Sequence, residues 1–412
     1  YILYFVILTL SIVAARGGVR LILILAAVNP VVVGFLTVKS AESYFTSKNE
    51  SKKIFFGIIS IIIIVSVIFT AYIYYNTDRY AAENYAPGIY QQQWQRAMAW
   101  VRDSTPENSV FAHWWDYGYW VQSIGKRATV LDGGNAIVYW DYLMGRYVLT
   151  ESDEDKMLEF LYTHNATHLL IDSTEIGKYT AFSSIGSDEN YDRFSWISAF
   201  VIDEKQTQET RDKQTYVYAG GTSVDEDIIW RDGSNDIFIP RGSILGAVLI
   251  SEENGTLLQP EGIFIYKDVQ YRIPLRYMHQ NGLLSDFKTG LDSGVFIYPR
   301  IIGESNGQVQ LNDKGALLYL SRRTINTPIA RMYLFNEESK YFKLVHSEDD
   351  LIVQQLKQSG VNKDFVEYQG FRGPIKIWEI NYPSSIKPNQ DYLKIDYPPE
   401  LDVKRAKKGY YN

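Results

Sequence analysis

The chain has 412 residues, a net charge of −7 and 46% hydrophobic residues, and it contains no cysteine. This length is sufficient for more than one domain, and the acidic balance argues against nucleic acid as a partner. The absence of cysteine excludes disulfides, thiolate metal sites and cysteine nucleophiles. The first residue, Tyr1, lies within an apolar run with no basic region before it, which leads us to expect a fragment whose N-terminal part is missing.

The beginning of the chain is predicted to be a multi-pass membrane segment. Apolar runs cover residues 1–15, 19–38 and 54–75, which predicts three helices, the first of them truncated. The segment 39–53 contains four lysines, so the positive-inside rule places it in the cytoplasm. Everything from Asn76 onward is then expected on the extracytoplasmic side, beginning with a polar connector.

Arg20 is a charged residue just inside the outer end of the second apolar run. Its side chain could reach the lipid head groups, as long cationic side chains often do. Alternatively, it faces a cavity and binds an anion, because ionisable residues at membrane depth are candidates for functional sites. The residue types by themselves leave both interpretations open.

The segment 76–214 is predicted to be a mixed α/β core. Apolar residues at spacings of three and four predict a helix over 91–102. A strand, a short helix and a second strand are predicted to follow it. A further helix is expected to begin after a Ser152 cap and to precede a strand that ends at Asp172. This alternation of helices and strands indicates an α/β arrangement.

From about residue 215 the pattern changes to short alternating strands with Asp-Gly and Asn-Gly turns. It predicts a β-rich domain over 215–320, either a barrel or a sandwich. A second β-rich, peripheral domain is predicted over 321–412, with a helical interlude near 327–335 and a basic tail. The expected fold is therefore a helical membrane segment, 1–75, followed by a large extracytoplasmic region with α/β and β-rich parts.

The most informative stretch is Ala112–Trp120, in which three tryptophans, two tyrosines, one histidine and one aspartate lie close together. Asp116 is unexpected in a buried strand, because an unpaired buried carboxylate is costly. Trp114 and Trp115 as N–H donors and Asp116 as an acceptor would suit recognition of a small polar group that has lost its water. A core aromatic cluster in which Asp116 caps a helix explains the same residues, and both interpretations stay open.

A second informative stretch begins at Asp172 and continues through Lys178 to Ile185. From the residues alone, Asp172 is a helix N-cap and Lys178 is a solvated side chain. His164 and His168 have the spacing of a zinc-binding pair on one helix. A predicted helix end between these two histidines argues against that metal site.

The run Trp-Trp-Asp-Tyr-Gly at 114–118, followed by Tyr119 and Trp120, resembles the signature of oligosaccharyltransferase catalytic subunits. Members of this family are membrane glycosyltransferases that transfer a lipid-linked glycan to Asn in Asn-X-Ser/Thr sequons. The segments 327–333 and 376–379 are also similar to archaeal members. The resemblance implies that the chain is the C-terminal part of such an enzyme, acting in protein N-glycosylation at the cell membrane.

The resemblance implies a site for the acceptor sequon. Trp114 and Trp115 would donate indole hydrogen bonds to the hydroxyl of the Ser or Thr two residues after the acceptor Asn. Asp116 would accept the proton of that hydroxyl. Ile185 would contact the same side chain through its apolar surface, and Lys178 would belong to the same site.

Two further assignments come from the resemblance. Asp172 and Lys178 match the family's kinked-helix motif by residue type but not by its usual spacing. Gly-Val-Arg-Leu around Arg20, followed by Asn29-Pro30, resembles the helix whose arginine lies beside the lipid-linked donor. Arg20 would then hold the phosphate of the leaving group through charge-assisted hydrogen bonds.

The resemblance also implies partners and a cofactor. The partners are an acceptor polypeptide with an Asn-X-Ser/Thr sequon, an oligosaccharide on a dolichyl-phosphate or -pyrophosphate carrier, and membrane lipid. The cofactor is Mn²⁺ or Mg²⁺. Family members draw the metal ligands and catalytic carboxylates from loops between earlier membrane helices, which would precede Tyr1. We therefore assign no catalytic residue and no metal ligand to this chain.

Two alternative functions stay open at this stage. The first is a membrane-anchored ectodomain whose aromatic residues hold a glycan. The second is another membrane glycosyltransferase, which acts on lipid or on a wall polymer. The alternatives differ from the main hypothesis in what Trp115 and Asp116 contact.

Overall fold

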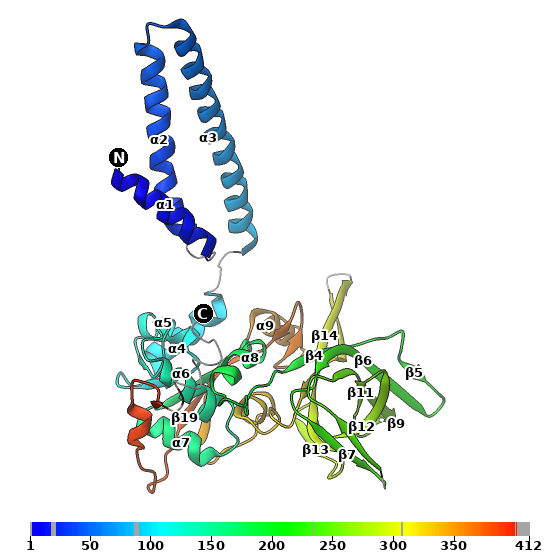
Figure 1. Cartoon of the computed structure of the whole chain (residues 1–412). Coiled ribbons are helices and arrows are strands. Elements are labelled where there is room, and N and C mark those ends of the chain that lie inside the picture. Colours follow the sequence, from blue (N-terminus) through cyan, green and yellow to red (C-terminus); the bar gives the residue numbers. More distant parts are fainter. Residues whose placement is uncertain are drawn as a thin grey trace. The chain divides into compact units, whose positions relative to one another are not determined.

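The computed structural model describes residues 2–17, 22–85, 90–233, 235–305, 308–399 and 401. The chain divides into two compact units, Tyr1–Ile89 and Tyr90–Asn412. The first unit is helical, and the second contains both helices and sheets (Figure 1). Arg20 lies outside the described residues, so its predicted contact with a phosphate stays a prediction.

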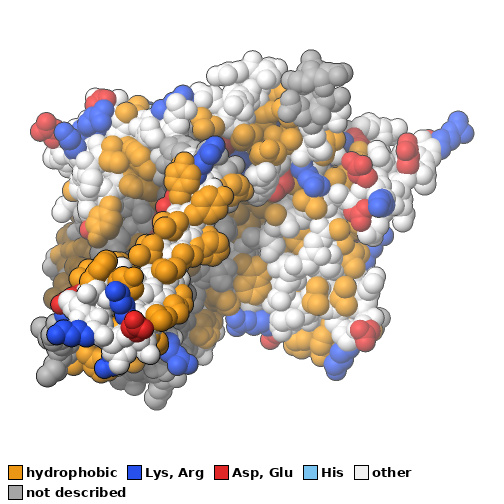
Figure 2. All heavy atoms as spheres, turned by 90° about the horizontal axis from the view of Figure 1, so that it is seen from above, with side chains coloured by type: hydrophobic (Ala, Val, Ile, Leu, Met, Phe, Trp, Pro, Cys, Tyr) orange, Lys and Arg blue, Asp and Glu red, His pale blue; other side chains and the backbone are white. Residues whose placement is uncertain are grey.

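The first unit consists of three helices: α1 (Ile2–Gly17), α2 (Ile22–Thr46) and α3 (Glu50–Tyr85). Helix α2 packs against both α1 and α3. Within the described residues, one helix, Glu50–Ala82, is long and apolar enough to cross a membrane. Many of its large apolar side chains are exposed, and hydrophobic side chains cover much of the visible surface of these helices (Figure 2).

Two predicted connectors of this unit are largely helical. Helix α2 continues to Thr46, through the start of the segment 39–53 that the sequence analysis interprets as a loop, and Lys39 pairs with Glu42 one turn later at 2.7 Å. Helix α3 continues to Tyr85, through the predicted polar connector. Hydropathy detects only the apolar part of a helix. Alanine and glutamate, which favour helix, let α3 extend beyond its apolar part.

The second unit contains a five-stranded sheet in the order β16-β19-β3-β1-β2. Strands β2, β1 and β3 pair in parallel, and β19 and β16 continue the sheet antiparallel. Its strands are β1 (Val110–Ala112), β2 (Ala128–Thr129), β3 (His168–Ile171), β16 (Phe342–Glu348) and β19 (Ile375–Ile380). The predicted α/β core is therefore present, and β2 is its shortest strand.

Short helices connect and cover this sheet. Their apolar faces form one core with the sheet, in which Phe111, Leu170 and Ile377 are fully buried. The helices are α4 (Gln92–Ser104), η2 (Trp115–Tyr117), α5 (Gly118–Ser123), α6 (Val138–Met144), η3 (Gly145–Leu149), α7 (Glu154–Thr163), α8 (Glu175–Ile185), η4 (Ile329–Leu334) and η5 (Gln390–Leu393). Helix α9 (Leu351–Gln358) instead buries Val353 and Leu356 in a separate small cluster with Val366.

Two details of the predicted helices differ. The cap of α7 is Asp153, whose side chain accepts a hydrogen bond from the Asp155 backbone N–H, and not Ser152. A carboxylate at this position also complements the positive end of the helix dipole, which gives Asp153 the advantage. The predicted helical interlude near 327–335 is a π-helix, η4.

The β-rich part is a barrel rather than a sandwich. The strands β12-β11-β9-β6-β4-β15-β14 follow one another, and the parallel pairing of β14 with β12 closes a seven-stranded ring. Its strands are β4 (Ser198–Ile202), β6 (Lys213–Ser223), β9 (Ile244–Glu253), β11 (Glu261–Tyr266), β12 (Val269–Gln280), β14 (Leu291–Ser305) and β15 (Gln308–Leu320). Phe200, Tyr218 and Phe264 are fully buried in its core.

Shorter strands extend the barrel sheet. They are β5 (Gln208–Glu209), β10 (Thr256–Leu257), β13 (Leu283–Asp286), β17 (Val366–Glu367) and β18 (Phe371–Arg372), and β7 (Ile228–Asp232) pairs with β8 (Asn235–Ile239) in a separate hairpin. The described residues of the predicted fourth domain, 321–412, form no sheet of their own. They contribute β16 and β19 to the five-stranded sheet and β17 and β18 to the barrel sheet.

Candidate functional site

The aromatic motif lies where β1 ends and the 3-10 helix η2 begins. The Trp114 side chain is only 2% exposed, whereas Trp115 and Asp116 are half-buried. Neither indole N–H donates a hydrogen bond within the described part of the chain, and neither nitrogen is among the buried polar atoms without a partner. Both N–H groups therefore keep access to solvent, even though the Trp114 ring belongs to the core.

Gly118 is required by the close approach of the backbone to a neighbouring turn. A Cβ atom at this position would lie 2.4 Å from the Asp132 Cα and 2.6 Å from the Leu131 carbonyl oxygen. No rotamer change can relieve a contact with backbone atoms. The glycine thus allows η2 and α5 to pack directly on the residues after β2, which fixes the direction in which Asp116 leaves the turn.

Aromatic stacking holds the other side of the turn. The Tyr117 ring stacks on Trp94 of α4 with the ring centroids 4.6 Å apart, and Trp94 also contacts Trp120 at 4.8 Å. Tyr117 is 3% exposed. Burial raises the pKa of the Tyr117 hydroxyl well above its usual value, and the nearby carboxylates of Glu175 and Asp172 raise it further.

The N-cap of helix α8 is Thr174 rather than the predicted Asp172, and Asp172 and Glu175 are linked across the turn that precedes the helix. The Asp172 carboxylate accepts a hydrogen bond from the Thr174 hydroxyl at 3.1 Å, and the Glu175 carboxylate accepts one from the Asp172 backbone N–H at 2.7 Å. This reciprocal arrangement satisfies donors at the helix start. Thr174 in turn hydrogen-bonds the Tyr117 hydroxyl at 2.6 Å, so the start of α8 is tied to the aromatic turn.

One face of α8 lies against the aromatic turn. Lys178, Phe182 and Ile185 are four and seven residues apart, which places them on the same side of a helix. Phe182 contacts the Trp114 ring edge to face at 5.8 Å. The Lys178 ammonium lies 2.6 Å from Asp116 Oδ2 and 3.0 Å from the Tyr117 hydroxyl oxygen.

The ion pair leaves half of the Asp116 carboxylate available. Oδ2 faces Lys178, and within the described residues Oδ1 accepts no hydrogen bond. The side chains of Asp116 and Lys178 are 24% and 32% exposed, so a ligand can reach both groups. A hydroxyl that donates to Oδ1 would therefore form a charge-assisted hydrogen bond with an acceptor that is already held in place.

Two buried carboxyls, Asp172 and Glu175, lie next to this ion pair and are 2% and 1% exposed. Burial raises the pKa of Asp172 and raises that of Glu175 to about 8, with the Asp172 charge as a second cause for Glu175. In the part of the chain that the structure describes, Glu175 Oε1 has no hydrogen-bond partner. At neutral pH Glu175 is therefore protonated for most of the time, which avoids a second negative charge beside Asp172.

The structure brings together most of the residues that the sequence analysis singled out. Trp114, Trp115, Asp116, Lys178 and Ile185 lie on the aromatic turn and on the adjacent face of α8. Sequence reasoning missed the part of Tyr117, Thr174 and Glu175 in this arrangement. The Asp-x-x-Glu spacing of a capping box was the signal that could have identified Thr174 and Glu175.

No metal site accompanies these residues. Among the described residues, no group of three or more His, Asp or Glu side chains could hold a metal ion. The predicted helix end between His164 and His168 is present. Helix α7 ends at Thr163, and His168 lies in β3, where its ring stacks on Phe111.

Comparison with known proteins finds segments that are similar to protein glycosyltransferases. No family model matches it. A segment of 45 residues is 49% identical to the dolichyl-phosphooligosaccharide-protein glycotransferase 1 of Pyrococcus furiosus, covering 10% of this chain and 5% of that protein. A segment of 131 residues is 27% identical to the dolichyl-diphosphooligosaccharide–protein glycosyltransferase subunit STT3 of Saccharomyces cerevisiae, covering 32% of this chain and 17% of that protein.

Segments of this chain are thus similar to members of the oligosaccharyltransferase family. The resemblance inferred from the Trp-Trp-Asp-Tyr-Gly run is therefore confirmed. The aligned segments span 5% and 17% of these two relatives, so the chain corresponds to a small part of each of them. The oligosaccharyltransferase AglB of Archaeoglobus fulgidus, solved with an inhibitory peptide and a dolichol-phosphate, is 14% identical with a TM-score of 0.41, covering 87% of this chain and 39% of that one.

Proposed function

We propose that this chain is part of an oligosaccharyltransferase that transfers an oligosaccharide from a dolichyl-phosphate or -pyrophosphate carrier to Asn in Asn-X-Ser/Thr. Its part in the reaction is to bind the Ser or Thr two residues after the acceptor Asn and so to position the Asn. The substrates follow from the names of the relatives. The observation that carries the binding role is Oδ1 of Asp116, which accepts no hydrogen bond among the described residues and belongs to the same turn as the two solvent-accessible indole N–H groups.

The chemistry of this group suits a side-chain hydroxyl. A hydroxyl both donates and accepts, so it can donate to Asp116 and accept from an indole N–H at the same time. Lys178 holds the Asp116 carboxylate in one orientation. Ile185 lies two turns farther along the same face of α8, where an apolar surface would meet the methyl group of Thr.

The size of the effect decides whether such a site can select sequons. A hydrogen bond to a charged partner contributes about 1.5–3 kcal/mol. A site built for a hydroxyl can reject a substrate without it by up to about 10⁴-fold, because its own polar groups are then left unpaired. Correct placement of the acceptor also matters for the reaction, because the carboxamide nitrogen is a poor nucleophile.

The donor side of the reaction rests on other groups. A divalent cation, Mn²⁺ or Mg²⁺, would stabilise negative charge on the leaving phosphate. The described residues contain no site for it, so we assign this chain no part in holding the metal. We further propose that α1, α2 and α3 belong to a multi-pass membrane segment, that Arg20 contacts the donor phosphate, and that Tyr90–Asn412 lies on the extracytoplasmic side.

The proposal is tested by peptide binding to the full chain in detergent, with one peptide containing Asn-X-Thr and another containing Asn-X-Ala. We expect the Thr peptide to bind at least about tenfold more tightly. Asp116→Asn should abolish most of this preference. Asp349→Asn is the matched control, because Asp349 is also 24% exposed and pairs with Lys357 at 2.9 Å.

Equal affinity for the two peptides would contradict the proposal. A preference that Asp116→Asn leaves intact would contradict the assignment of the hydroxyl to this carboxylate. Binding of sugars without any binding of the Thr peptide would instead favour a membrane-anchored glycan-binding ectodomain.

A further inference from the structure

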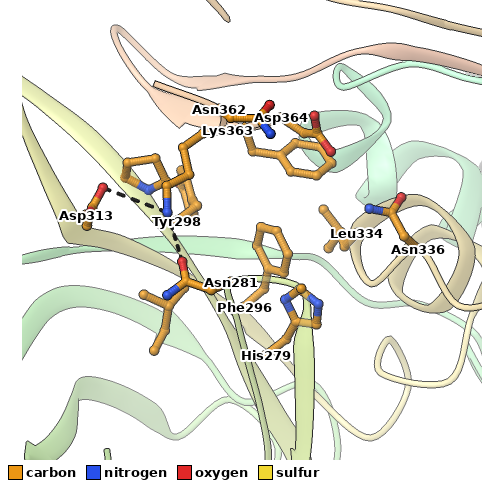
Figure 3. Close-up of a pocket in the computed structure, with 14 residues that line it drawn as sticks. His279, Asn281, Phe296, Tyr298, Asp313, Leu334, Asn336, Asn362, Lys363 and Asp364 are labelled. Carbon is orange, nitrogen blue, oxygen red and sulfur yellow. Dashed lines mark hydrogen bonds and ion pairs between the residues drawn. The ribbon is translucent and has the colours of Figure 1, made fainter. Parts of the chain in front are cut away.

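A second polar cavity lies in the Tyr90–Asn412 unit, between the barrel and the segment that precedes β17. It has a volume of about 300 Å³ and is lined by residues of β12, β14, η4 and the turns next to them (Figure 3). None of its lining residues belongs to the aromatic turn or to α8. The proposed acceptor site does not explain it.

His279 is the most unusual residue of this cavity. The side chain is 5% exposed and lies between Phe296 and Phe335, with ring centroids 5.0 and 4.9 Å away. Both ring nitrogens are buried and have no hydrogen-bond partner among the described residues. A buried polar atom without a partner is costly, and the great majority of such atoms in native proteins are satisfied. A bound polar group would remove this cost.

The protonation state of His279 defines what the cavity offers. Burial lowers the pKa of His279 to about 4, and the charge of the nearby Lys376 lowers it further. At neutral pH the ring is uncharged and presents one N–H donor and one lone-pair acceptor. A hydroxyl group can satisfy either of them, whereas a carboxylate or phosphate can satisfy only the donor.

Two asparagine amides are oriented by lysines at the same cavity. Lys363 donates to Asn281 Oδ1 at 2.8 Å, and Lys376 donates to Asn336 Oδ1. An ammonium group can only donate, so it fixes which end of each amide is the oxygen. The NH₂ group of Asn336 is turned toward the cavity, opposite Lys363 (Figure 3).

The remaining lining residues restrict the charge of a ligand. Asp313 lies 3.9 Å from Lys363, and Asp364 lies 2.8 Å from Lys357, so both carboxylates of the lining are already paired. Among the described lining residues, no charge is left without a partner for an ionic ligand. Among the described residues no cluster of three metal ligands exists, which argues against a cation site. Phe296, Leu334 and Phe365 supply apolar surface.

We infer that this cavity binds one neutral pyranose ring, with His279 and the amides of Asn281 and Asn336 contacting its hydroxyls. A pyranose combines hydroxyls that both donate and accept with ring carbons that pack on aromatic edges. The volume of 300 Å³ is at the low end for ligand pockets, which suits a single ring rather than a chain of sugars. This inference goes beyond the proposed acceptor site and does not depend on it.

The test uses the full chain in detergent and a panel of methyl pyranosides, which are neutral and chemically defined. Titration calorimetry and saturation-transfer NMR should detect binding of at least one of them with a Kd on the order of 1 mM. His279→Phe keeps the planar ring and removes both nitrogens, and it should weaken binding by about tenfold. His164→Phe is the matched control, because His164 is half-buried among aromatic rings but does not line the cavity.

A second variant covers the case in which His279→Phe perturbs folding. Asn281 is exposed and has a φ of 51°, so Asn281→Gly removes the amide while keeping a permitted backbone. It should weaken binding of the same pyranoside by a few fold at unchanged thermal stability. The ligand could be a free sugar or the terminal sugar of a glycan, and a neutral oligosaccharide that ends in the same sugar distinguishes them. Binding of the oligosaccharide as tight as that of the pyranoside, or tighter, indicates a terminal sugar of a glycan. Weaker binding indicates a free sugar.

Three results would overturn the inference. The first is the absence of binding of any pyranoside at about 50 mM, which is far above the expected Kd. The second is pyranoside binding that neither variant weakens. The third is competition by inorganic phosphate for the same cavity. The test is separate from that of the acceptor site. Asp116→Asn should leave pyranoside binding unchanged, and His279→Phe should leave the preference for the Thr peptide unchanged.

Discussion

At the scale of single residues, the site depends on charges that lie close together and are only partly in water. Asp116 and Lys178 form an ion pair at 2.6 Å with both side chains partly exposed, so solvent screens the pair and its contribution to stability is small. Its importance is geometric, because it orients one carboxylate oxygen away from the lysine. The buried Asp172 and Glu175 next to it have the opposite character and make stability depend on pH.

Glu175 gives a prediction for the pH dependence of stability. Its pKa is about 8 in the folded chain, raised by burial from a usual value near 4.5. Between these values the folded state holds a proton that the unfolded state has lost, so stability falls as pH rises from about 4.5 to 8. Glu175→Gln should therefore raise the thermal midpoint at pH 8 and leave it nearly unchanged at pH 5.

At pH 8, Glu175→Gln is expected to raise the free energy of unfolding by about 2 kcal/mol. This is less than the full pKa shift of Glu175 implies, because the titration of Glu175 is coupled to the charge of Asp172. Thermal unfolding of the wild type and of Glu175→Gln at pH 5, 6.5 and 8 measures it. Parallel curves for the two proteins would show that Glu175 is not protonated in the folded chain.

At the scale of elements, the aromatic turn and α8 show two opposite requirements for glycine. Gly118 is in contact with the backbone after β2, whereas a Cβ atom at Gly177 in α8 would meet no atom within 4 Å. The same substitution should therefore have opposite effects at the two positions. Gly145 and Gly186 repeat the first case, because a Cβ at Gly145 would lie 2.5 Å from the Phe182 carbonyl oxygen.

Gly118→Ala and Gly177→Ala form a matched pair. Gly118→Ala should lower the free energy of unfolding by about 2–3 kcal/mol, because the methyl group meets backbone atoms that cannot move aside. Gly177→Ala should raise it by about 0.5–1 kcal/mol, because alanine favours the helix and no atom opposes it. Chemical denaturation of the two variants measures both changes, and a loss of similar size in each would refute the role given to Gly118.

At the scale of the whole molecule, the Tyr90–Asn412 unit is assembled from segments far apart in the sequence. Strand β19 lies between β16 and β3, so the end of the chain completes the sheet from which the aromatic motif emerges. The Gln93 amide donates to the Gly373 carbonyl at 3.0 Å, which ties α4 to the same late segment. Removal of residues after 320 should therefore disrupt the sheet beside the candidate site.

Two buried histidines and one half-buried histidine in this unit predict a loss of stability in acid. Burial lowers the pKa values of His113, His164 and His279 to about 4. The unfolded chain binds their protons near pH 6.5, so stability falls as pH decreases from about 6.5 to 4. At pH 5, unfolding of His164→Phe should take up about one proton fewer than unfolding of the wild type. Calorimetry in buffers of different ionisation enthalpy measures this number, and equal uptake would contradict the neutral state of folded His164.

The sequence by itself determined the features that depend on neighbouring residues. Apolar periodicity located α4, and the change to alternating strands located the barrel region. The Trp-Trp-Asp-Tyr-Gly run at 114–118 was sufficient to indicate the resemblance to the oligosaccharyltransferase family. Local patterns predicted the ends of α2 and α3 less precisely, because both helices continue into polar segments that hydropathy does not detect.

Only the tertiary structure decided which distant residues meet. The path of the whole chain decides that Asp116 pairs with Lys178 and that β19 lies beside β3. It also decides that the His279 ring nitrogens are buried without a hydrogen-bond partner among the described residues. Burial, which raises the pKa of Glu175 and lowers that of His279, has the same origin. A local pattern fixes the conformation of a segment, but desolvation and pairing require partners that the fold brings from elsewhere in the chain.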